Sequence, residues 1–512
     1  MDNKRIFGFG SSYILYALIL FFIYLFLPTK QSTIDGYGYA NYIRDAESLF
    51  LSHHLLYNFI GYLWVSFLKL VGISNTLGAL KAMNAIFAAL SLLTLGKIFK
   101  KLGYSDSKTS VWVLFTGSSW GVMRFATENE TYIIPIFLSL LASHFYLLHC
   151  KQKSSTRILL AGFFAAFACL VHQIHFFWWL AIILALFIKR DYRGALKYAI
   201  PALLVPIVYS LVLRLYYNIE LSLESLLEFA LRDFYSGSAT VGFGLKYIVL
   251  SGISFFRAFL QVHGYLGNLM EISHWYILGV LGFIVLISIG LYNIKEMSAS
   301  FKEILSPITL AFLIAFGLHL LFAVMSHGNS EFMVMLPFLV AIILSKILSN
   351  EIRLVGYIAL AMFVWNISFG LIPLSRHSID GNGMVAIAVE KSNSTQTLFV
   401  VFSKPSIDNQ VRYYNGNYPT NTISATQTKD TGDVVEAIYI ALSNGQTVYT
   451  DCIDRPKTIS RESLTMVSNL QVFSGFHQQK VDSIKTLTGK YYLVKLMPIT
   501  DIQTKDRNQS RR

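Results

Sequence analysis

Residues 13–27 read YILYALILFFIYLFL, and residues 34–42, a short distance further on, read IDGYGYANY. The first stretch is apolar throughout and is typical of a helix that enters the membrane. It lacks a small-x-small cleavage site before the polar Lys30-Gln31-Ser32, so we expect it to be retained rather than removed as a signal peptide. The second stretch sets the carboxylate of Asp35 just beyond the membrane boundary, where ionisable groups are costly to dehydrate and usually serve a function.

The composition of the whole chain predicts a polytopic membrane protein. Of its 512 residues 54% are hydrophobic and only 14% are charged, whereas soluble domains carry about 25% charged residues. About eleven apolar runs of near-spanning length follow one another, at residues 11–28, 80–99, 109–123, 131–149, 157–171, 173–188, 198–217, 275–293, 304–326, 332–348 and 354–373.

The net charge of +13 is distributed as a membrane topology would distribute it. With the N-terminus inside, the inner loops hold seventeen Lys and Arg against six acids, whereas the outer side up to residue 373 holds nine basic and eleven acidic residues. This is the positive-inside pattern. We therefore expect a multi-pass protein with a cytoplasmic N-terminus and no binding to nucleic acid. Because no eukaryotic targeting signal is recognised, we expect the membrane to be a bacterial inner membrane.

After residue 374 the composition becomes mostly polar, which predicts a transmembrane domain over residues 1–374 and a soluble extracytoplasmic domain over residues 375–512. Strands are expected at 397–402, 446–451 and 491–496, with a helix over 433–443 that ends at Asn444-Gly445. The alternation of strand, helix and strand favours a small α/β domain with a parallel, doubly wound sheet. The three scattered cysteines, Cys150, Cys169 and Cys452, predict neither a disulfide framework nor a metal site.

Two further segments are expected on the outer face. Residues 35–73 predict two helices that lie along the membrane interface, because they are rich in Tyr and Trp but too polar and interrupted to span. Residues 221–271 predict a long outer connection. Its apolar piece at 247–262 is an alternative twelfth span, but the charges at Lys295 and Lys302 fit better if that piece does not cross.

The predicted topology brings carboxylates, imidazoles and one arginine to the same outer boundary from several separate connections. They include Asp35, Asp45, His53, His54, Arg124, Glu128, Glu130, His172 and Glu331. If these groups converge, they suit general-base chemistry, phosphate recognition through arginine and divalent metal binding through carboxylates. The metal, Mg²⁺ or Mn²⁺, would be held by Asp45, Glu128 and Glu130.

Each of these residues also has a structural interpretation. Asp35 could orient the first loop, and His53 and His54 could extend toward lipid headgroups. Acids such as Glu128 and Glu331 also occur at helix N-termini for electrostatic reasons. His172 precedes an ordinary aromatic belt. The shared face is therefore a stronger indication than any single residue.

Several short motifs resemble those of the GT-C membrane glycosyltransferases that use polyprenyl-phosphate sugars, such as aminoarabinose and protein mannosyltransferases. The motifs are Asp35 with Tyr39-Ala40, residues 53–57 (HHLLY), residues 70–74 (LVGIS) and residues 331–337 (EFMVMLP). Gly36 stands where that family has a second acid, which bears on metal dependence, and the last motif lacks the family's Tyr.

The resemblance implies a sugar donor on undecaprenyl or dolichyl phosphate and a lipid, glycan or protein acceptor on the extracytoplasmic face. Asp35 would be the general base that deprotonates an acceptor hydroxyl or amine, with inversion at the anomeric carbon. The donor phosphate and substrate would be bound by His53, His54, Arg124, Arg232, His172 and Glu331.

Two other functions remain open on the sequence alone. A polyisoprenoid-lipid or glycan transporter would also need many spans, although it would carry ionisable residues near mid-membrane, whereas here most acids lie at the outer boundary. A non-catalytic assembly protein would use the C-terminal domain as its binding module. Replacing Asp35 by Asn separates these readings, because it should abolish transfer only in the enzyme.

Overall fold

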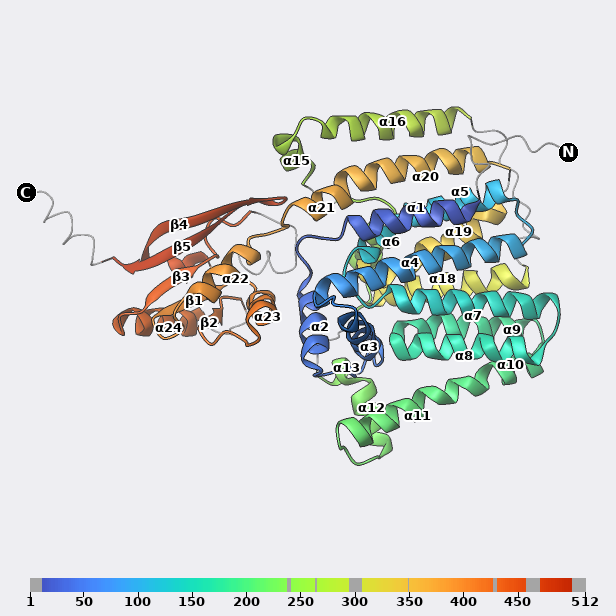
Figure 1. The fold of residues 1–512 in the computed structure, drawn as a ribbon, viewed down its shortest axis with the longest axis horizontal. Helices are drawn as coiled ribbons and strands as arrows, with labels where there is room; N and C mark the ends of the chain where they lie inside the picture. The colour runs from blue at the N-terminus through green and yellow to red at the C-terminus, as the bar shows by residue number, and fades with distance from the viewer. Residues whose placement is uncertain are drawn as a thin grey trace, which may run out of the picture. The chain divides into compact units, whose positions relative to one another are not determined.

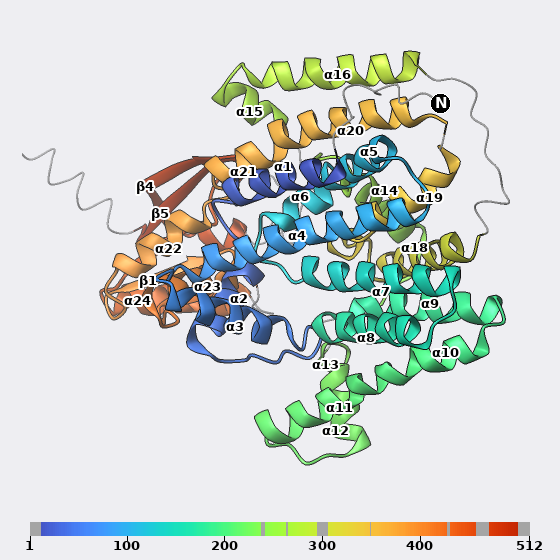
Figure 2. The ribbon, with the colours of Figure 1, turned by 45° about the vertical axis from the view of Figure 1, so that its right-hand side comes forward.

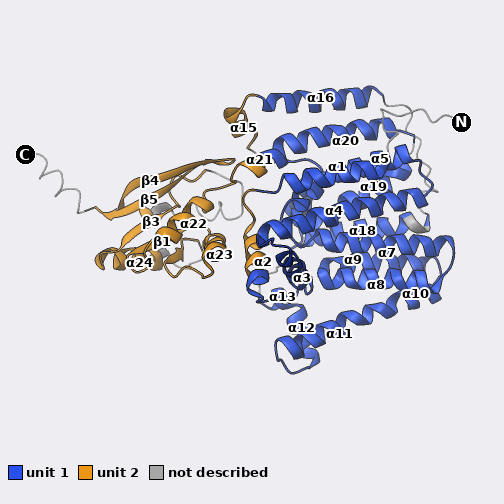
Figure 3. Ribbon diagram, viewed as in Figure 1, with its two compact units in different colours: residues 1–29, 42–262, 275–372 blue, residues 30–41, 263–274, 373–512 orange. Residues whose placement is uncertain are grey.

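The computed structural model describes residues 12–236, 241–262, 265–293, 306–348, 350–426, 431–456 and 470–499. Its contacts divide the chain into two compact units (Figure 3). Unit 1 comprises residues 1–29, 42–262 and 275–372, and unit 2 comprises residues 30–41, 263–274 and 373–512. Four charges used in the topology argument, at Lys4, Arg5, Lys295 and Lys302, lie outside the described residues.

Unit 1 is built from helices (Figure 1). Its principal helices are α1 Tyr13–Phe26, α3 Tyr57–Leu70, α4 Thr76–Lys101, α5 Asp106–Gly117, α6 Trp120–Ala126, α7 Ile133–Lys151, α8 Ser155–Val171, α9 Phe176–Ile188, α10 Tyr192–Ala199, α11 Leu204–Leu211, α12 Leu223–Ala230, α13 Arg232–Tyr235, α14 Leu245–Arg257, α16 Tyr276–Tyr292, α18 Pro307–Met325, α19 Leu336–Ile347 and α20 Ile352–Asn366. Short 3-10 or π segments join some of them: η1 Gln173–His175, η2 Ile200–Leu203, η3 Val212–Tyr216, η4 Ser330–Met333 and η5 Ile367–Leu371.

Within the described residues, five continuous helical stretches are long and apolar enough to cross a membrane. They are Thr76–Lys101, Ile133–Lys151, Tyr192–Tyr216, Ser330–Ile347 and Ile352–Arg376. Five shorter apolar helices lie at Tyr13–Phe26, Ser155–Val171, Gln173–Ile188, Tyr276–Tyr292 and Thr309–Met325. These ten coincide with predicted apolar runs, which supports a multi-pass membrane fold, while the count of about eleven spans stays a prediction.

The predicted run at 109–123 is not one helix. It divides into α5 and α6 at Ser118-Ser119, because the backbone there is bonded to other elements. Asn366 donates from Nδ2 to Ser118 O at 2.7 Å, and the first N–H groups of α6, at Trp120 and Gly121, donate to Phe259 O and Ala258 O. The end of α14 thus accepts hydrogen bonds that an unbroken helix would make internally.

Helix α14 also bears on the candidate twelfth span at 247–262. It has 13 residues, too few for a hydrocarbon core that needs about 20, and it is not among the apolar helices of spanning character. The expectation that this segment does not cross stays a prediction.

Close helix packing in unit 1 rests on small side chains, as is usual for membrane helices. The face of α8 toward its neighbours includes Ala161, Gly162 and Ala165, all buried. A Cβ on Gly162 would lie 2.2 Å from Tyr198 O in α10, so only glycine permits this approach. Figures 1 and 2 show α7, α8 and α9 lying side by side, with α4 next to α7.

Unit 2 combines the first part of α2 (Ile34–Asp45) and α15 (Leu266–Ile272) with the C-terminal region. The C-terminal elements are α21 Ile372–Arg376, α22 Asn382–Lys391, β1 Thr397–Val401, α23 Lys404–Asn415, β2 Thr422–Ser424, α24 Thr431–Ser443, β3 Thr447–Thr450, η6 Leu470–Phe473, β4 Phe476–Thr486 and β5 Gly489–Pro498. Ile438 of α24 belongs to the core on one face of the sheet and Ile407 of α23 to the core on the other.

The sheet has strand order β2-β1-β3-β5-β4. Strand β1 pairs in parallel with β3, as the sequence predicts, and also with β2, a strand that the sequence analysis did not predict, whereas β5 is antiparallel to β3 and to β4. The expectation of a wholly parallel sheet is therefore wrong at this edge. The antiparallel pairing of β4 with β5 follows from the short turn at Leu487-Thr488, since strands joined by so few residues can only be antiparallel.

Candidate functional site

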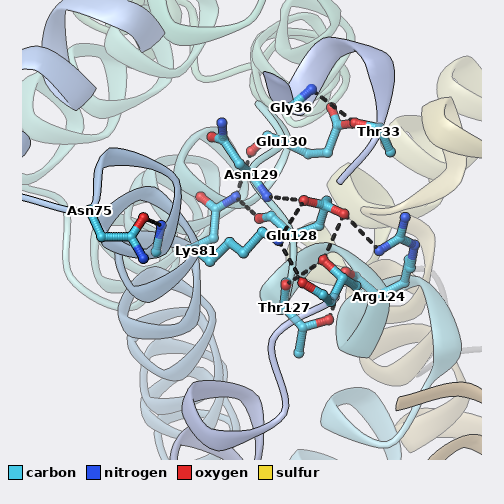
Figure 4. Close-up of polar contacts among 12 residues, drawn as sticks. Thr33, Gly36, Asn75, Lys81, Arg124, Thr127, Glu128, Asn129 and Glu130 are labelled. Carbon is cyan, nitrogen blue, oxygen red and sulfur yellow. Dashed lines mark hydrogen bonds and ion pairs between the residues drawn. The ribbon is translucent and has the colours of Figure 1, made fainter. Parts of the chain in front are cut away.

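Asp35 lies in the first turn of α2 and is exposed. Thr33 begins this helix, because its Oγ1 accepts a hydrogen bond from Gly36 N at 2.9 Å and its carbonyl accepts one from Tyr37 N (Figure 4). A hydroxyl in this position caps a helix N-terminus, and a carboxylate in the first turn is favoured by the helix dipole. The fold therefore presents Asp35 at a capped helix end in unit 2.

Glu128 occupies a buried ionic site in unit 1 (Figure 4). Its carboxylate lies 3.6 Å from Lys81 Nζ and 3.1 Å from Arg124 Nη1. It also accepts hydrogen bonds from Thr29 Oγ1 at 2.8 Å and from Asn129 N at 2.9 Å. Burial by itself raises the pKa of this carboxyl, but the neighbouring cations outweigh burial and hold that pKa below its ordinary value. Glu128 is therefore an anion in the fold.

The backbone around Glu128 is fixed by Asn84 of α4. Its Nδ2 donates to the carbonyls of both Glu128 and Glu130, each at 2.7 Å. Tyr57 of α3 donates to Asn129 Oδ1 at 2.8 Å. Burial and the nearby charge of Glu130 raise the pKa of this phenol, which stays protonated as a donor. Residues 128–130 are thus fixed by hydrogen bonds from α4 and from α3.

A second row of polar rings runs from the first loop to the η4 segment. His53 Nδ1 lies 3.0 Å from the carboxylate of Asp233, and its ring contacts His54. The ring of His172 lies 5.6 Å from that of His54 and 5.1 Å from that of Tyr132, measured between centroids. The hydroxyl of Tyr132 donates to Glu331 at 3.2 Å. Four predicted site residues, His53, His54, His172 and Glu331, therefore lie along one continuous row.

Both inner histidines of this row are neutral near pH 7. Burial lowers the pKa of His54 well below its ordinary value, and it lowers the pKa of His172 to about 3, with smaller contributions from neighbouring imidazoles. His172 Nδ1 accepts a hydrogen bond from Ile174 N, which leaves its Nε2 as the protonated nitrogen. A neutral imidazole is a hydrogen-bond partner here and not a cation for phosphate.

Arg232 lies in α13 and Asp45 at the end of α2, whereas Lys81 and Arg124 of the buried ionic site lie in α4 and α6. Arg232 is exposed in α13, next to the Asp233 that binds His53. Asp45 accepts two hydrogen bonds from Arg44, at 2.7 and 2.9 Å.

The predicted metal ligands do not form a metal site. The carboxylate of Asp45 is engaged by Arg44 and that of Glu128 by two cations. Among the described residues, no three side chains of the metal-binding types converge. Mg²⁺ and Mn²⁺ prefer several carboxylate or water oxygens around one point. Because two of these carboxylates are paired with cations and the described side chains do not converge, the set does not fit either metal, and we derive no chemical step through one.

Lys81 is the principal site residue that sequence reasoning missed. It is 5% exposed, and its Nζ donates to Thr29 O at 2.7 Å besides facing Glu128. The signal was present, because Lys81 is a charged residue inside an apolar run, and such residues are rare and usually functional. Tyr132, which joins His172 to Glu331, was missed for want of any distinctive pattern.

No family model matches the sequence, and no curated protein is similar to it. Solved structures do share the fold. ArnT from Cupriavidus metallidurans bound to undecaprenyl phosphate is 11% identical with a TM-score of 0.53, and the match covers 94% of this chain and 97% of that one. An oligosaccharyltransferase from Archaeoglobus fulgidus in complex with Zn and sulfate is 12% identical with a TM-score of 0.51, over 93% of this chain and 72% of that one.

A second structure of the Archaeoglobus fulgidus enzyme, tethered with an acceptor peptide, is 10% identical with a TM-score of 0.50 and covers 94% of this chain and 74% of that one. ArnT and this oligosaccharyltransferase are both GT-C glycosyltransferases. At such low identity the likeness concerns the fold. At that level it confirms the GT-C resemblance that the sequence motifs predicted.

Proposed function

We propose that this chain is a membrane glycosyltransferase that moves a sugar from a polyprenyl-phosphate donor to an acceptor hydroxyl or amine on the extracytoplasmic face. The observation that carries the proposal is the buried Lys81–Glu128–Arg124 site in a chain that has the fold of an ArnT bound to undecaprenyl phosphate. Cations fixed at the end of an apolar helix suit the phosphate of a lipid whose hydrocarbon chain lies among the helices.

In the proposed reaction Asp35 takes the proton of the acceptor hydroxyl while the oxygen attacks the anomeric carbon. The bond between that carbon and the phosphate oxygen breaks, and the polyprenyl phosphate leaves with the electron pair. A single displacement inverts the configuration. Lys81 and Arg124 stabilise the charge that develops on the leaving phosphate; a single well-placed donor in the oxyanion hole of an acyl-transfer enzyme contributes about 3–4 kcal/mol.

The remaining predicted residues have supporting roles in this proposal. His53, His54, His172 and Glu331 form the wall of the donor region, with the two inner imidazoles acting as neutral hydrogen-bond partners. Arg232 would act beside these residues, which is supported by the contact of its neighbour Asp233 with His53. The C-terminal domain selects the acceptor.

The test is sugar transfer by the purified protein in detergent, supplied with a panel of radiolabelled polyprenyl-phosphate sugars and candidate acceptors, with and without EDTA. Asp35→Asn is compared with the wild type and with Asp433→Asn. Asp433 is a suitable control because it is also an exposed acid in the first turn of a helix of unit 2. We expect transfer by the wild type and the control and at least a 10³-fold loss in Asp35→Asn.

Transfer that survives in Asp35→Asn would remove this residue as the base. A folded wild type that turns over no donor with any acceptor would instead support transport or assembly. Loss of transfer on EDTA treatment would show a metal requirement that the described carboxylates do not explain.

A further inference from the structure

The helix that carries Asp35 is bound to the C-terminal domain by Asn409 of α23. Asn409 Nδ2 donates to Ile34 O at 3.1 Å, at the start of α2. Its backbone carbonyl accepts a hydrogen bond from Asn41 Nδ2 at 2.9 Å, about two turns further along α2. Between these points a Cβ on Gly38 would come within 3.3 Å of Asn409 Nδ2, so the two helices approach closely there. One residue thus engages both ends of this part of α2.

Aromatic and polar contacts extend this attachment. Tyr37, which is 4% exposed, lies with its ring centroid 5.8 Å from that of Tyr413 and 6.4 Å from that of Tyr414. Just before α2, Gln31 donates to Asp380 at 2.6 Å and accepts from Ile379 N at 3.0 Å. All these contacts lie within unit 2, which therefore includes residues 30–41 (Figure 3).

Helix α2 depends on these contacts for its conformation. It has only 12 residues, and Gly36 and Gly38 each cost helix stability relative to alanine. An isolated helix of this length and composition is unstable in water. Because Thr33 caps only its first turn, the direction in which α2 presents Asp35 is set by what it packs against.

We propose that Asn409 is a positioning residue for the general base, so that the C-terminal domain controls catalysis through the orientation of α2. This inference rests on the proposed function of Asp35 and goes beyond it, because it gives the C-terminal domain a part in the chemical step as well as in acceptor selection. Small displacements of a reacting group lower rates steeply, by about 10²-fold for roughly 1 Å. Removing the amide of Asn409 should therefore act on turnover.

The test compares Asn409→Ala with Asn415→Ala, which replaces an exposed asparagine of the same helix. We expect Asn409→Ala to lower kcat by about 10- to 100-fold while KM for the donor changes by less than about 2-fold. In an Asp35→Asn background the same substitution should cause no further loss, since it acts through Asp35. Asn415→Ala should match the wild type in both backgrounds.

Hydrogen exchange supplies a readout that does not require activity. Amides of residues 34–41 should exchange faster in Asn409→Ala than in the wild type and in Asn415→Ala, while those of the sheet strand β1 should not change. Three results would each overturn the inference. They are amide exchange in α2 of Asn409→Ala at the wild-type rate, an unchanged kcat in Asn409→Ala, and a loss of kcat that adds to the loss caused by Asp35→Asn. Failure of the proposed function is distinguishable, because it would appear as a wild type that transfers no sugar.

Discussion

At the scale of single residues, the site in unit 1 depends on opposite charges buried together. Lys81 and Glu128 have side chains that are 6% and 1% exposed, and Arg124 is the third member. A buried pair of this kind adds little net stability, because dehydrating both ions offsets their attraction. Removing one partner is costly, however, since a charge that stays buried then loses part of its compensation. Stability and activity can therefore respond differently when one charge or two charges are removed, which separates a structural role of the site from a functional one.

We predict that Lys81→Met or Glu128→Gln alone will destabilise the protein by about 3–5 kcal/mol. The double variant should regain part of this stability, because the two most buried charges are then both removed and only Arg124, whose side chain is 15% exposed, loses its partner. It should nevertheless stay inactive, because the proposed phosphate ligand Lys81 is missing. Unfolding midpoints in detergent and transfer rates measure the two effects separately.

Lys69→Met is the matched control, because Lys69 is an exposed lysine in α3 of the same unit. It should alter neither the midpoint nor the rate. If the double variant regains transfer together with stability, the pair has only a structural role and the phosphate-binding proposal for Lys81 fails.

The buried imidazole of His172 predicts a specific pH dependence. The pKa of this group is about 3 in the fold and 6.5 in the unfolded chain. Between these values the unfolded chain binds the proton more readily, so stability falls as the pH falls below about 6.5, by up to about 1.4 kcal/mol per pH unit. The thermal unfolding midpoint in detergent should therefore decrease from pH 7.5 to pH 5.

His172→Gln removes the titrating group but keeps a hydrogen-bond acceptor for Ile174 N. Its midpoint should decrease less steeply over the same pH range. Equal slopes in the variant and the wild type would show that other groups, such as His54, govern the acid response.

At the scale of elements, the break between α5 and α6 is held by one side chain of α20. Asn366 is fully buried, donates to Ser118 O and Phe259 O at 2.7 and 2.8 Å, and accepts from Gln261 N at 2.9 Å. We predict that Asn366→Ala will destabilise the protein by several kcal/mol, since each buried backbone group left unsatisfied costs about 1–3 kcal/mol. Thermal unfolding in detergent measures the change.

The control is Asn293→Ala at the end of α16. The side-chain amide of Asn293 donates to the carbonyl of Ile289 in its own helix and bridges no other element among the described contacts. Its replacement should cost less than about 1 kcal/mol. A similar small effect for Asn366→Ala would mean that the break is maintained by the sequence of α5 and α6 themselves.

Apolar runs and the parallel strands β1 and β3 follow from local patterns, and they are where the sequence predicts them. The hydrogen bonds that surround the break at Ser118-Ser119 come from Asn366 and from the end of α14, which are remote in sequence, so a local pattern could not predict them. Strand β4 was missed because most of its side chains are polar and exposed, and its pairing with β5 alone makes it a strand.

In the site, too, local patterns predict single residues but not the contacts between distant ones. His54, His172 and Glu331 could be proposed one by one, because each is an ionisable residue at a predicted boundary. Their connection through Tyr132 could not be predicted, since it requires the packing of separate helices. Lys81 was within reach of sequence reasoning, but its partnership with Glu128 is tertiary.

At the scale of the whole molecule, the fold and the function are separate conclusions. A chain only 11% identical to ArnT keeps its fold over 94% of its length, because apolar helix faces and small packing residues can be provided by many sequences. The same fold can host different chemistry, so the proposed activity depends on the residues of its site. The orientation of the chain in the membrane is the global property on which that activity depends.

We predict that the C-terminal domain is extracytoplasmic and that the α9–α10 loop is cytoplasmic, as the excess of basic residues in that loop indicates. Ser394→Cys and Lys189→Cys, both at exposed positions, test this in a background that lacks Cys150, Cys169 and Cys452. A membrane-impermeant maleimide should label Ser394→Cys in intact spheroplasts but label Lys189→Cys only after permeabilisation. The unsubstituted background should stay unlabelled in both conditions. The opposite pattern would invert the topology and place Asp35 away from an extracytoplasmic acceptor.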